Sequence, residues 1–185
     1  MKIRLVKTKD AGFKPLMKRI LARRGTRADG VEQRVDEILA AVQKQGDRAL
    51  LRYTEMFDRV HLTRATMEVK AAEIERALTK VPGKDLSTLR LAARRIAVFH
   101  RCQLQKSWHY RDPLGMRLGQ RITALERVGV YVPAGKALYP STVLMNVIPA
   151  KVAGVKEIIM TSPIGNQGAL ILAAAHVAGV DRIFR

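Results

Sequence analysis

Apolar residues recur with the period of a helix over much of the first hundred residues. Between Val31 and Val42 they fall at every third or fourth position with charged residues between them, which predicts an amphipathic helix that ends at Gly46. The same reasoning predicts three more helices: from Asp47 to Phe57, over roughly 71–80, and from Ser87 to Gln105. Residues 1–107 are therefore expected to form a helical N-terminal region.

The pattern changes after residue 107. Short polar pieces with Gly115 and Gly119 predict a β-ribbon linker over 108–126. Compact β-branched runs then alternate with helical ones: strand Arg127–Val132, helix Pro140–Gly154, strand Glu157–Ser162, helix Ala169–Ala178 and a strand from Val180. Pro149 is expected to kink or split the first of these helices, because proline lacks the N–H that a helix interior needs.

Crossovers of this length join parallel strands, so the last region is expected to be a right-handed βαβαβ unit. The predicted fold class is α/β: a helical N-terminal layer followed by a parallel Rossmann-like half-sheet over 127–185, which is an incomplete domain. Antiparallel pairing between Val128–Val132 and Ile158–Thr161 would refute this prediction.

Composition is that of a globular protein, with 48 % hydrophobic and 27 % charged residues among 185. Cys102 is the only cysteine, which excludes an internal disulfide and a cysteine-only metal site. The N-terminus has no apolar stretch typical of a secretory signal, and no run approaches the roughly 18 apolar residues of a membrane span. A reducing, cytoplasmic setting without membrane contact is expected.

The net charge of +18, from 34 basic and 16 acidic residues, is unusual. All but five of the basic residues precede Val128, so the helical region carries most of the excess. Such a region suits an anionic partner. Because the basic residues are scattered and only 5 % of the chain is aromatic, a solvated surface is favoured and a nucleic-acid partner is unlikely.

Candidate chemistry gathers in the loop after the strand that ends near Tyr131. It contains Gly135, followed by Ser141 and Thr142 at the start of the next helix. Ligands of open α/β sheets bind beyond the carboxyl ends of strands, and helix N-termini favour anions. On spacing alone, an equally good interpretation is that Gly135 serves the turn and Ser141 or Thr142 caps the helix. The four histidines lack metal-ligand spacing, and no acidic pair indicates acid–base catalysis.

The same loop carries a family resemblance. The segment from Leu125 to Val155, LERVGVYVPAGKALYPSTVLMNVIPAKVAGV, resembles the histidinol dehydrogenase family very closely. Further similar segments lie on both sides, among them GDRALLRYT at Gly46–Thr54 and AAAHVAGVD at Ala173–Asp181. The resemblance covers essentially the whole chain.

The resemblance implies an enzyme of histidine biosynthesis that oxidises L-histidinol to L-histidine through the aldehyde, with two NAD+ and a zinc ion. It also implies a homodimer with two incomplete Rossmann-like domains. By motif match Tyr131 is the NAD contact, and Gly135, Ser141 and Thr142 are expected near the cofactor. Ala134 stands where the family has a glycine, and its methyl group restricts the turn.

The family's members are more than twice as long as this chain. Its zinc ligands, its glutamate–histidine acid–base pair and a second NAD contact have no match here, so no catalytic or metal-binding residue is assigned. The chain is expected to be a truncated form, inactive alone. The alternative is a non-catalytic truncated paralogue that binds anions or nucleic acid through its basic helical region.

Overall fold

The computed structural model describes residues 5–22, 30–133, 138–164 and 168–185. The chain divides into two compact units, Met1–Tyr53 and Thr54–Arg185. The sequence predicted three regions with boundaries near residues 107 and 126 instead. That division into functional regions stays a prediction, although the later helices share one compact unit with the sheet.

Helices make up most of the described part of the first unit. Its elements are α1 (Phe13–Ala22), α2 (Val31–Gln45) and α3 (Asp47–Asp58), the last of which runs into the second unit. The sequence reasoning missed α1. It correctly ended α2 at Gly46, which adopts a φ of 55° and donates its N–H to the carbonyl of Val42 at 2.8 Å.

Two helices precede the strands of the second unit: α4 (Ala71–Lys80) and α5 (Gly83–Arg101). α4 has its predicted bounds. The predicted bounds of α5, Ser87 to Gln105, lie too far along the chain at both ends. The helix starts earlier because Pro82 takes the N-cap position with a φ of −55°, which suits the start of a helix. After Arg101 the chain leaves the helix through tight turns, with the N–H of Gln103 bonded to the carbonyl of His100 at 3.0 Å.

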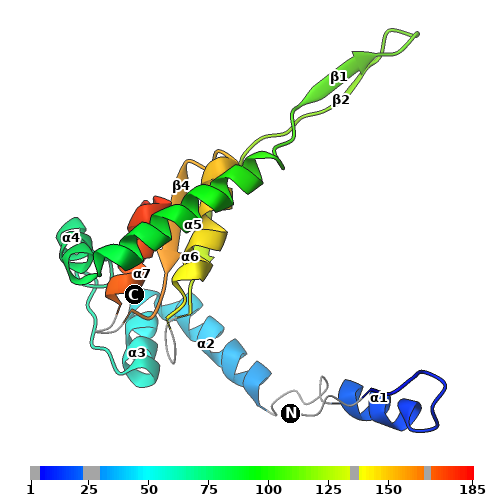
Figure 1. Ribbon diagram of the computed structural model, residues 1–185. Coiled ribbons are helices and arrows are strands. Elements are labelled where there is room, and N and C mark those ends of the chain that lie inside the picture. Colours follow the sequence, from blue (N-terminus) through cyan, green and yellow to red (C-terminus); the bar gives the residue numbers. More distant parts are fainter. Residues whose placement is uncertain (1–4, 23–29, 134–137, 165–167) are drawn as a thin grey trace. The chain divides into compact units, whose positions relative to one another are not determined.

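The predicted ribbon is present as two antiparallel strands, β1 (Trp108–Arg111) and β2 (Arg117–Gln120), which pair with each other (Figure 1). Asp112 organises the turn between them. Its Oδ1 accepts hydrogen bonds from the N–H of Leu114 at 3.0 Å and of Met116 at 2.8 Å. Gly115 supplies the left-handed φ of 85° that the turn requires.

The second sheet has three strands in the order β3 (Arg127–Tyr131), β4 (Glu157–Thr161) and β5 (Arg182–Phe184). Both pairings are parallel, as predicted. Side chains alternate along each strand. In β3, for example, Val130 and the following Val132 are buried, whereas Tyr131 is exposed.

The crossovers between these strands are α6 (Pro140–Val152) and α7 (Ala169–Ala178). α6 continues through Pro149, so the expected split does not occur. Pro149 lies one turn before the end of the helix, and its carbonyl still accepts the N–H of Ala153 at 2.9 Å. α7 ends at Gly179, whose left-handed φ of 81° closes the helix as predicted.

α6 and α7 pack on each other and against the buried side of the sheet, and α4 and α5 form a further layer on them. The core consists of β-branched and aliphatic residues from all three layers, with Val132, Leu144, Ile158, Met160 and Ile171 among its most buried members. The predicted α/β class with an incomplete Rossmann-like half-sheet is therefore confirmed. Within the described residues, no helix combines the length and apolarity needed to cross a bilayer.

Candidate functional site

Three residues form a row across the sheet at the carboxyl ends of its strands. Tyr131 of β3 is in register with Thr161 of β4, and Thr161 with Phe184 of β5. Residues in register share a face, and this is the face away from the buried Met160. The side chain of Tyr131 is 64 % exposed. Its ring is thus open to solvent at the edge where α/β sheets bind ligands.

The first turn of α6 lies beyond the same edge. Its N-cap is Tyr139, whose side chain makes no capping hydrogen bond, and the turn contains no acidic residue. Ser141 and Thr142 are therefore helical residues, and the expectation that one of them is the N-cap is wrong. The N–H of Thr142 is bonded to the carbonyl of Tyr139 at 3.0 Å. Gly135 lies outside the described residues.

Ser162, directly after β4, is a residue that the sequence analysis did not single out. It follows the alternation of Ile158 and Met160 and is fully buried. Its backbone is well paired, since its N–H donates to the carbonyl of Phe184 at 3.0 Å. Its Oγ has no hydrogen-bond partner in the described part of the chain, which is costly for a buried hydroxyl. The only feature of the sequence that could have pointed to Ser162 is its position as a serine at the end of an apolar strand.

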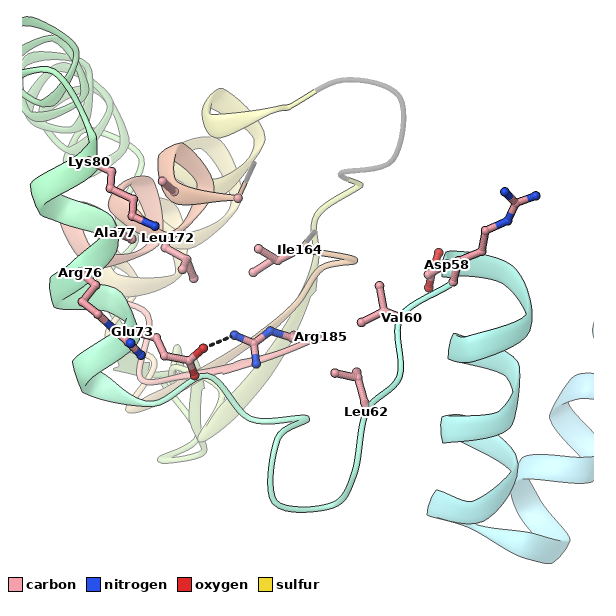
Figure 2. Close-up of a pocket in the computed structure, with 13 residues that line it drawn as sticks. Asp58, Val60, Leu62, Glu73, Arg76, Ala77, Lys80, Ile164, Leu172 and Arg185 are labelled. Carbon is pink, nitrogen blue, oxygen red and sulfur yellow. Dashed lines mark hydrogen bonds and ion pairs between the residues drawn. The ribbon is translucent and has the colours of Figure 1, made fainter. Parts of the chain in front are cut away.

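A cavity of about 630 Å³ opens beside the start of α7 (Figure 2). It is lined by residues near the end of α3, one side of α4, the first turn of α7 and Arg185. Tyr131, Ser141 and Thr142 do not line it. The structure therefore does not bring the predicted site residues into this cavity.

One ion pair closes a side of the cavity. Arg185 Nη2 lies 2.5 Å from Glu73 Oε2, and its Nη1 donates to the carbonyl of Thr66 at 2.8 Å. The pKa of Glu73 is lowered, chiefly by the backbone N–H of Lys70 at 3.0 Å and further by Arg185, against the effect of burial. Figure 2 shows this pair among the residues that line the cavity. Arg185 balances the charge of the ionised Glu73. Of the other charged lining residues Arg59, Arg76 and Lys80 are basic and Asp58 is acidic, so the cavity favours anions.

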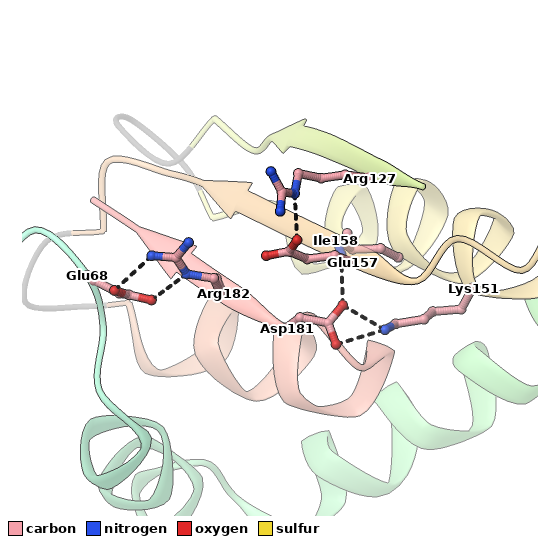
Figure 3. A network of polar contacts seen from close by, with 7 residues as sticks. All are labelled: Glu68, Arg127, Lys151, Glu157, Ile158, Asp181 and Arg182. Atoms are coloured by element: carbon pink, nitrogen blue, oxygen red, sulfur yellow. Dashed lines mark hydrogen bonds and ion pairs between the residues drawn. The ribbon is translucent and has the colours of Figure 1, made fainter. Parts of the chain in front are cut away.

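The amino ends of the strands carry a different set of contacts (Figure 3). Arg127 Nε lies 2.5 Å from Glu157 Oε2 and joins β3 to β4. Arg182 binds Glu68 through two nitrogens, at 2.8 and 3.1 Å, and its hydrogen bond lowers the pKa of that carboxyl. These pairs join neighbouring segments of the chain.

Asp181 completes this amino-end network (Figure 3). Its Oδ2 accepts the N–H of the buried Ile158 at 2.7 Å and the ammonium of Lys151 at 2.8 Å. Burial by itself would raise the pKa of Asp181, but these two donors together lower it. The contact ties α6, β4 and the start of β5 together, so its role is structural.

The described residues do not fit a zinc site. No three histidine, cysteine or acidic side chains among them are grouped closely enough to hold a metal ion. His61 is near Glu55 and His100 is near Gln103, each within an exposed pair.

Comparison with known proteins identifies the family. The sequence profile of histidinol dehydrogenase matches residues 21–185. The chain belongs to the histidinol dehydrogenase family. It is 52 % identical to histidinol dehydrogenase of Syntrophotalea carbinolica over 99 % of its own length, and 47 % identical to that of Dechloromonas aromatica over 98 %.

The fold agrees with this membership. The crystal structure of histidinol dehydrogenase from Elizabethkingia anophelis superposes with a TM-score of 0.79 at 29 % identity, and the match covers 86 % of this chain. It covers 37 % of that structure, and the chain spans 43 % of the length of each of the two curated relatives. More than half of a relative's length thus has no counterpart here.

Proposed function

We propose that the chain contributes part of a cytoplasmic histidinol dehydrogenase, which oxidises L-histidinol to L-histidine with two NAD+ and zinc. Its family membership over residues 21–185 supports the reaction class. The observation that carries the cofactor proposal is Tyr131. It matches the family's NAD-contacting tyrosine and lies exposed at the carboxyl end of β3.

NAD+, when bound, supplies the hydride acceptor. The chain's own residues would bind and orient it: the ring of Tyr131 would contact the cofactor, and the first turn of α6 with Ser141 and Thr142 would offer a site for an anionic group. The acid-free first turn of α6 supports this role, because the positive end of a helix dipole favours anions. By motif match alone, Gly135 permits close approach of the backbone.

The other parts of the reaction are proposed to lie outside this chain. The relatives are more than twice as long, and the described residues offer no grouped metal ligands. We therefore expect the zinc ligands and the acid–base pair to come from sequence that the relatives have in addition. The working enzyme is proposed to be a homodimer.

Titration with NAD+ tests the cofactor site. A site with part of its contacts should bind weakly, with a millimolar dissociation constant or about −4 kcal/mol. Tyr131→Ala should weaken binding by roughly three- to tenfold, the range expected for loss of one aromatic contact. Ligand-observed NMR is suited to such affinities.

Phe99→Ala is the matched control. Phe99 on α5 is 63 % exposed, nearly the same as Tyr131, so both variants remove one exposed ring. Phe99→Ala should leave NAD+ binding unchanged. Equal NAD+ affinity in wild type and Tyr131→Ala would refute the assignment of Tyr131.

A further inference from the structure

The cavity beside the start of α7 has the size of a small-molecule site. Its volume is about 630 Å³, within the roughly 300–1,000 Å³ that such sites span. The charged residues of its lining are two acidic ones, Asp58 and Glu73, and four basic ones, Arg59, Arg76, Lys80 and Arg185. The lining therefore carries a surplus of two positive charges.

One side of α4 supplies two of these cations. Arg76 and Lys80 follow Glu73 by three and seven residues, a spacing that places all three on one side of a helix. Figure 2 shows them on the side of α4 that borders the cavity. Arg76 donates from Nε to the carbonyl of Ala72 at 3.2 Å, and neither Arg76 nor Lys80 forms an ion pair within the described residues. Both charges are thus available to a ligand.

The backbone of Arg59 gives independent evidence for a ligand. Arg59 follows the last residue of α3, donates its N–H to the carbonyl of Glu55 at 3.1 Å and adopts a φ of 56°. It is the one residue other than glycine with a positive φ in the described part of the chain. Glycine and asparagine adopt this left-handed conformation at lower cost than arginine. Residues held in costly conformations cluster at functional sites, so the position indicates a role for the charged side chain.

The guanidinium of Arg59 has no other task that the structure shows. It forms no hydrogen bond and no ion pair with any residue that the structure describes. Its charge therefore does not stabilise α3 through a local contact, and the cavity that it lines is the feature left to explain it.

The uncharged part of the lining is aliphatic. Leu62, Ile164 and Leu172 contribute to it, and Figure 2 shows these side chains around the cavity. Among the described residues that line it there is no aromatic one, so a ring of the ligand would find no stacking partner. α7 begins at this wall, and its first turn contains no acidic residue that would repel an anion.

We propose that this cavity binds a phosphate monoester with an aliphatic body. A phosphate monoester carries close to two negative charges at neutral pH, which matches the surplus of the lining. Its oxygens suit the forked donors of two arginines. Arg59, Arg76 and Lys80 bind the phosphate, and the aliphatic residues contact the body. A monocarboxylate would leave one positive charge unbalanced.

This site is separate from the proposed cofactor site. Tyr131, Ser141 and Thr142 do not line the cavity. Each phosphate of NAD+ is esterified on both sides and carries a single charge, so NAD+ lacks the terminal phosphate that the lining selects. The proposal therefore does not depend on the proposed function.

Butyl phosphate and inorganic phosphate are suitable probes for the 185-residue chain. Amide shifts in proton–nitrogen correlation spectra measure the affinity and locate the site. For inorganic phosphate we expect a dissociation constant on the order of 1 mM, and for butyl phosphate a value about tenfold lower, because its chain is partly buried. The shifts should be largest at lining residues such as Arg59, Ala77 and Ala169. Butanol and acetate should bind at least about tenfold more weakly than butyl phosphate.

Arg59→Asn and Lys80→Gln test the cations one at a time. Each should weaken binding of butyl phosphate by about three- to tenfold, the range for one charge-assisted contact at an open site. Arg59→Asn should do so without lowering the melting temperature, because asparagine tolerates the left-handed φ. Arg95→Gln is the matched control: Arg95 is exposed on α5 and does not line the cavity, so binding should be unchanged.

Equal affinity of the wild type, Arg59→Asn and Lys80→Gln for butyl phosphate would overturn the proposal. So would an equal loss in Arg95→Gln, an absence of shifts at the lining residues up to about 20 mM butyl phosphate, or shifts confined to the first turn of α6. Tyr131→Ala should leave butyl phosphate binding unchanged, and Arg59→Asn should leave NAD+ binding unchanged. Failure of this proposal and failure of the cofactor proposal are therefore distinguishable.

Discussion

Replacing Asp181 with alanine should destabilise the second unit by about 2–3 kcal/mol. The carboxylate accepts the N–H of Ile158 at 2.7 Å, and Ile158 is fully buried. Without Asp181 this N–H loses its acceptor, which costs about 1–3 kcal/mol for a buried group. The Lys151 ion pair adds at most about 1 kcal/mol, since both partners are roughly one-third exposed.

Two variants separate these contributions. Asp181→Asn keeps an oxygen for the N–H of Ile158 and should cost about 1 kcal/mol. Lys151→Met leaves the bond to Ile158 intact and should cost no more than about 1 kcal/mol. In urea unfolding followed by circular dichroism, the midpoint of Asp181→Ala should fall by about 1 M. An effect no larger than that of Lys151→Met would refute the reasoning.

The pH dependence of the same variant provides an independent check. The pKa of Asp181 is lower in the folded chain than its ordinary value near 3.8. Its contribution is therefore present above that ordinary pKa and is lost as the pH falls through the lower, folded-state value. The stability difference between wild type and Asp181→Ala should be constant near neutral pH and shrink below about pH 4.

Two further predictions concern the carboxyl edge and the reaction. Ser162→Ala should raise the free energy of unfolding by about 1 kcal/mol, because it removes a buried hydroxyl that has no partner in the described chain; a lower melting temperature would contradict this. The 185-residue chain with histidinol, NAD+ and zinc should form no NADH, whereas a mixture with the additional C-terminal portion of a relative should. Turnover by the chain alone would refute the proposed division of the site.

Periodicity predicted the helices and strands of the second unit because many of their apolar positions are buried. In α2 the apolar stripe marks a helix although none of its residues is buried. α4 and α7 were predicted with their observed bounds, and β3 and β4 to within one residue. The errors fall where local chemistry outweighs periodicity. Pro82 starts α5 earlier than its apolar stripe does, and Pro149 is tolerated because it lies one turn before the end of α6.

The site was less predictable than the fold. Tyr131 ends β3, and Ser141 and Thr142 begin α6 shortly after it, so a linear motif singles them out as candidates. The cavity beside α7 depends on residues as far apart as Glu73 and Arg185, whose contact arises only because the segment before α4 pairs with the end of β5. Linear spacing carries no information on such a pair.

The two ends of the three-stranded sheet are built for different tasks. At the amino ends, every charged side chain of the network has a partner: Arg127 with Glu157, Glu68 with Arg182, and Asp181 with Lys151. At the carboxyl ends the reverse holds, with an exposed ring at Tyr131, a buried hydroxyl without a partner at Ser162 and an uncapped first turn in α6. Groups left unsatisfied cost stability, and proteins retain them chiefly where a ligand completes them. Variants at the amino ends should therefore change the free energy of unfolding with little effect on NAD+ binding, whereas Tyr131→Ala at the carboxyl ends should weaken NAD+ binding with little effect on unfolding.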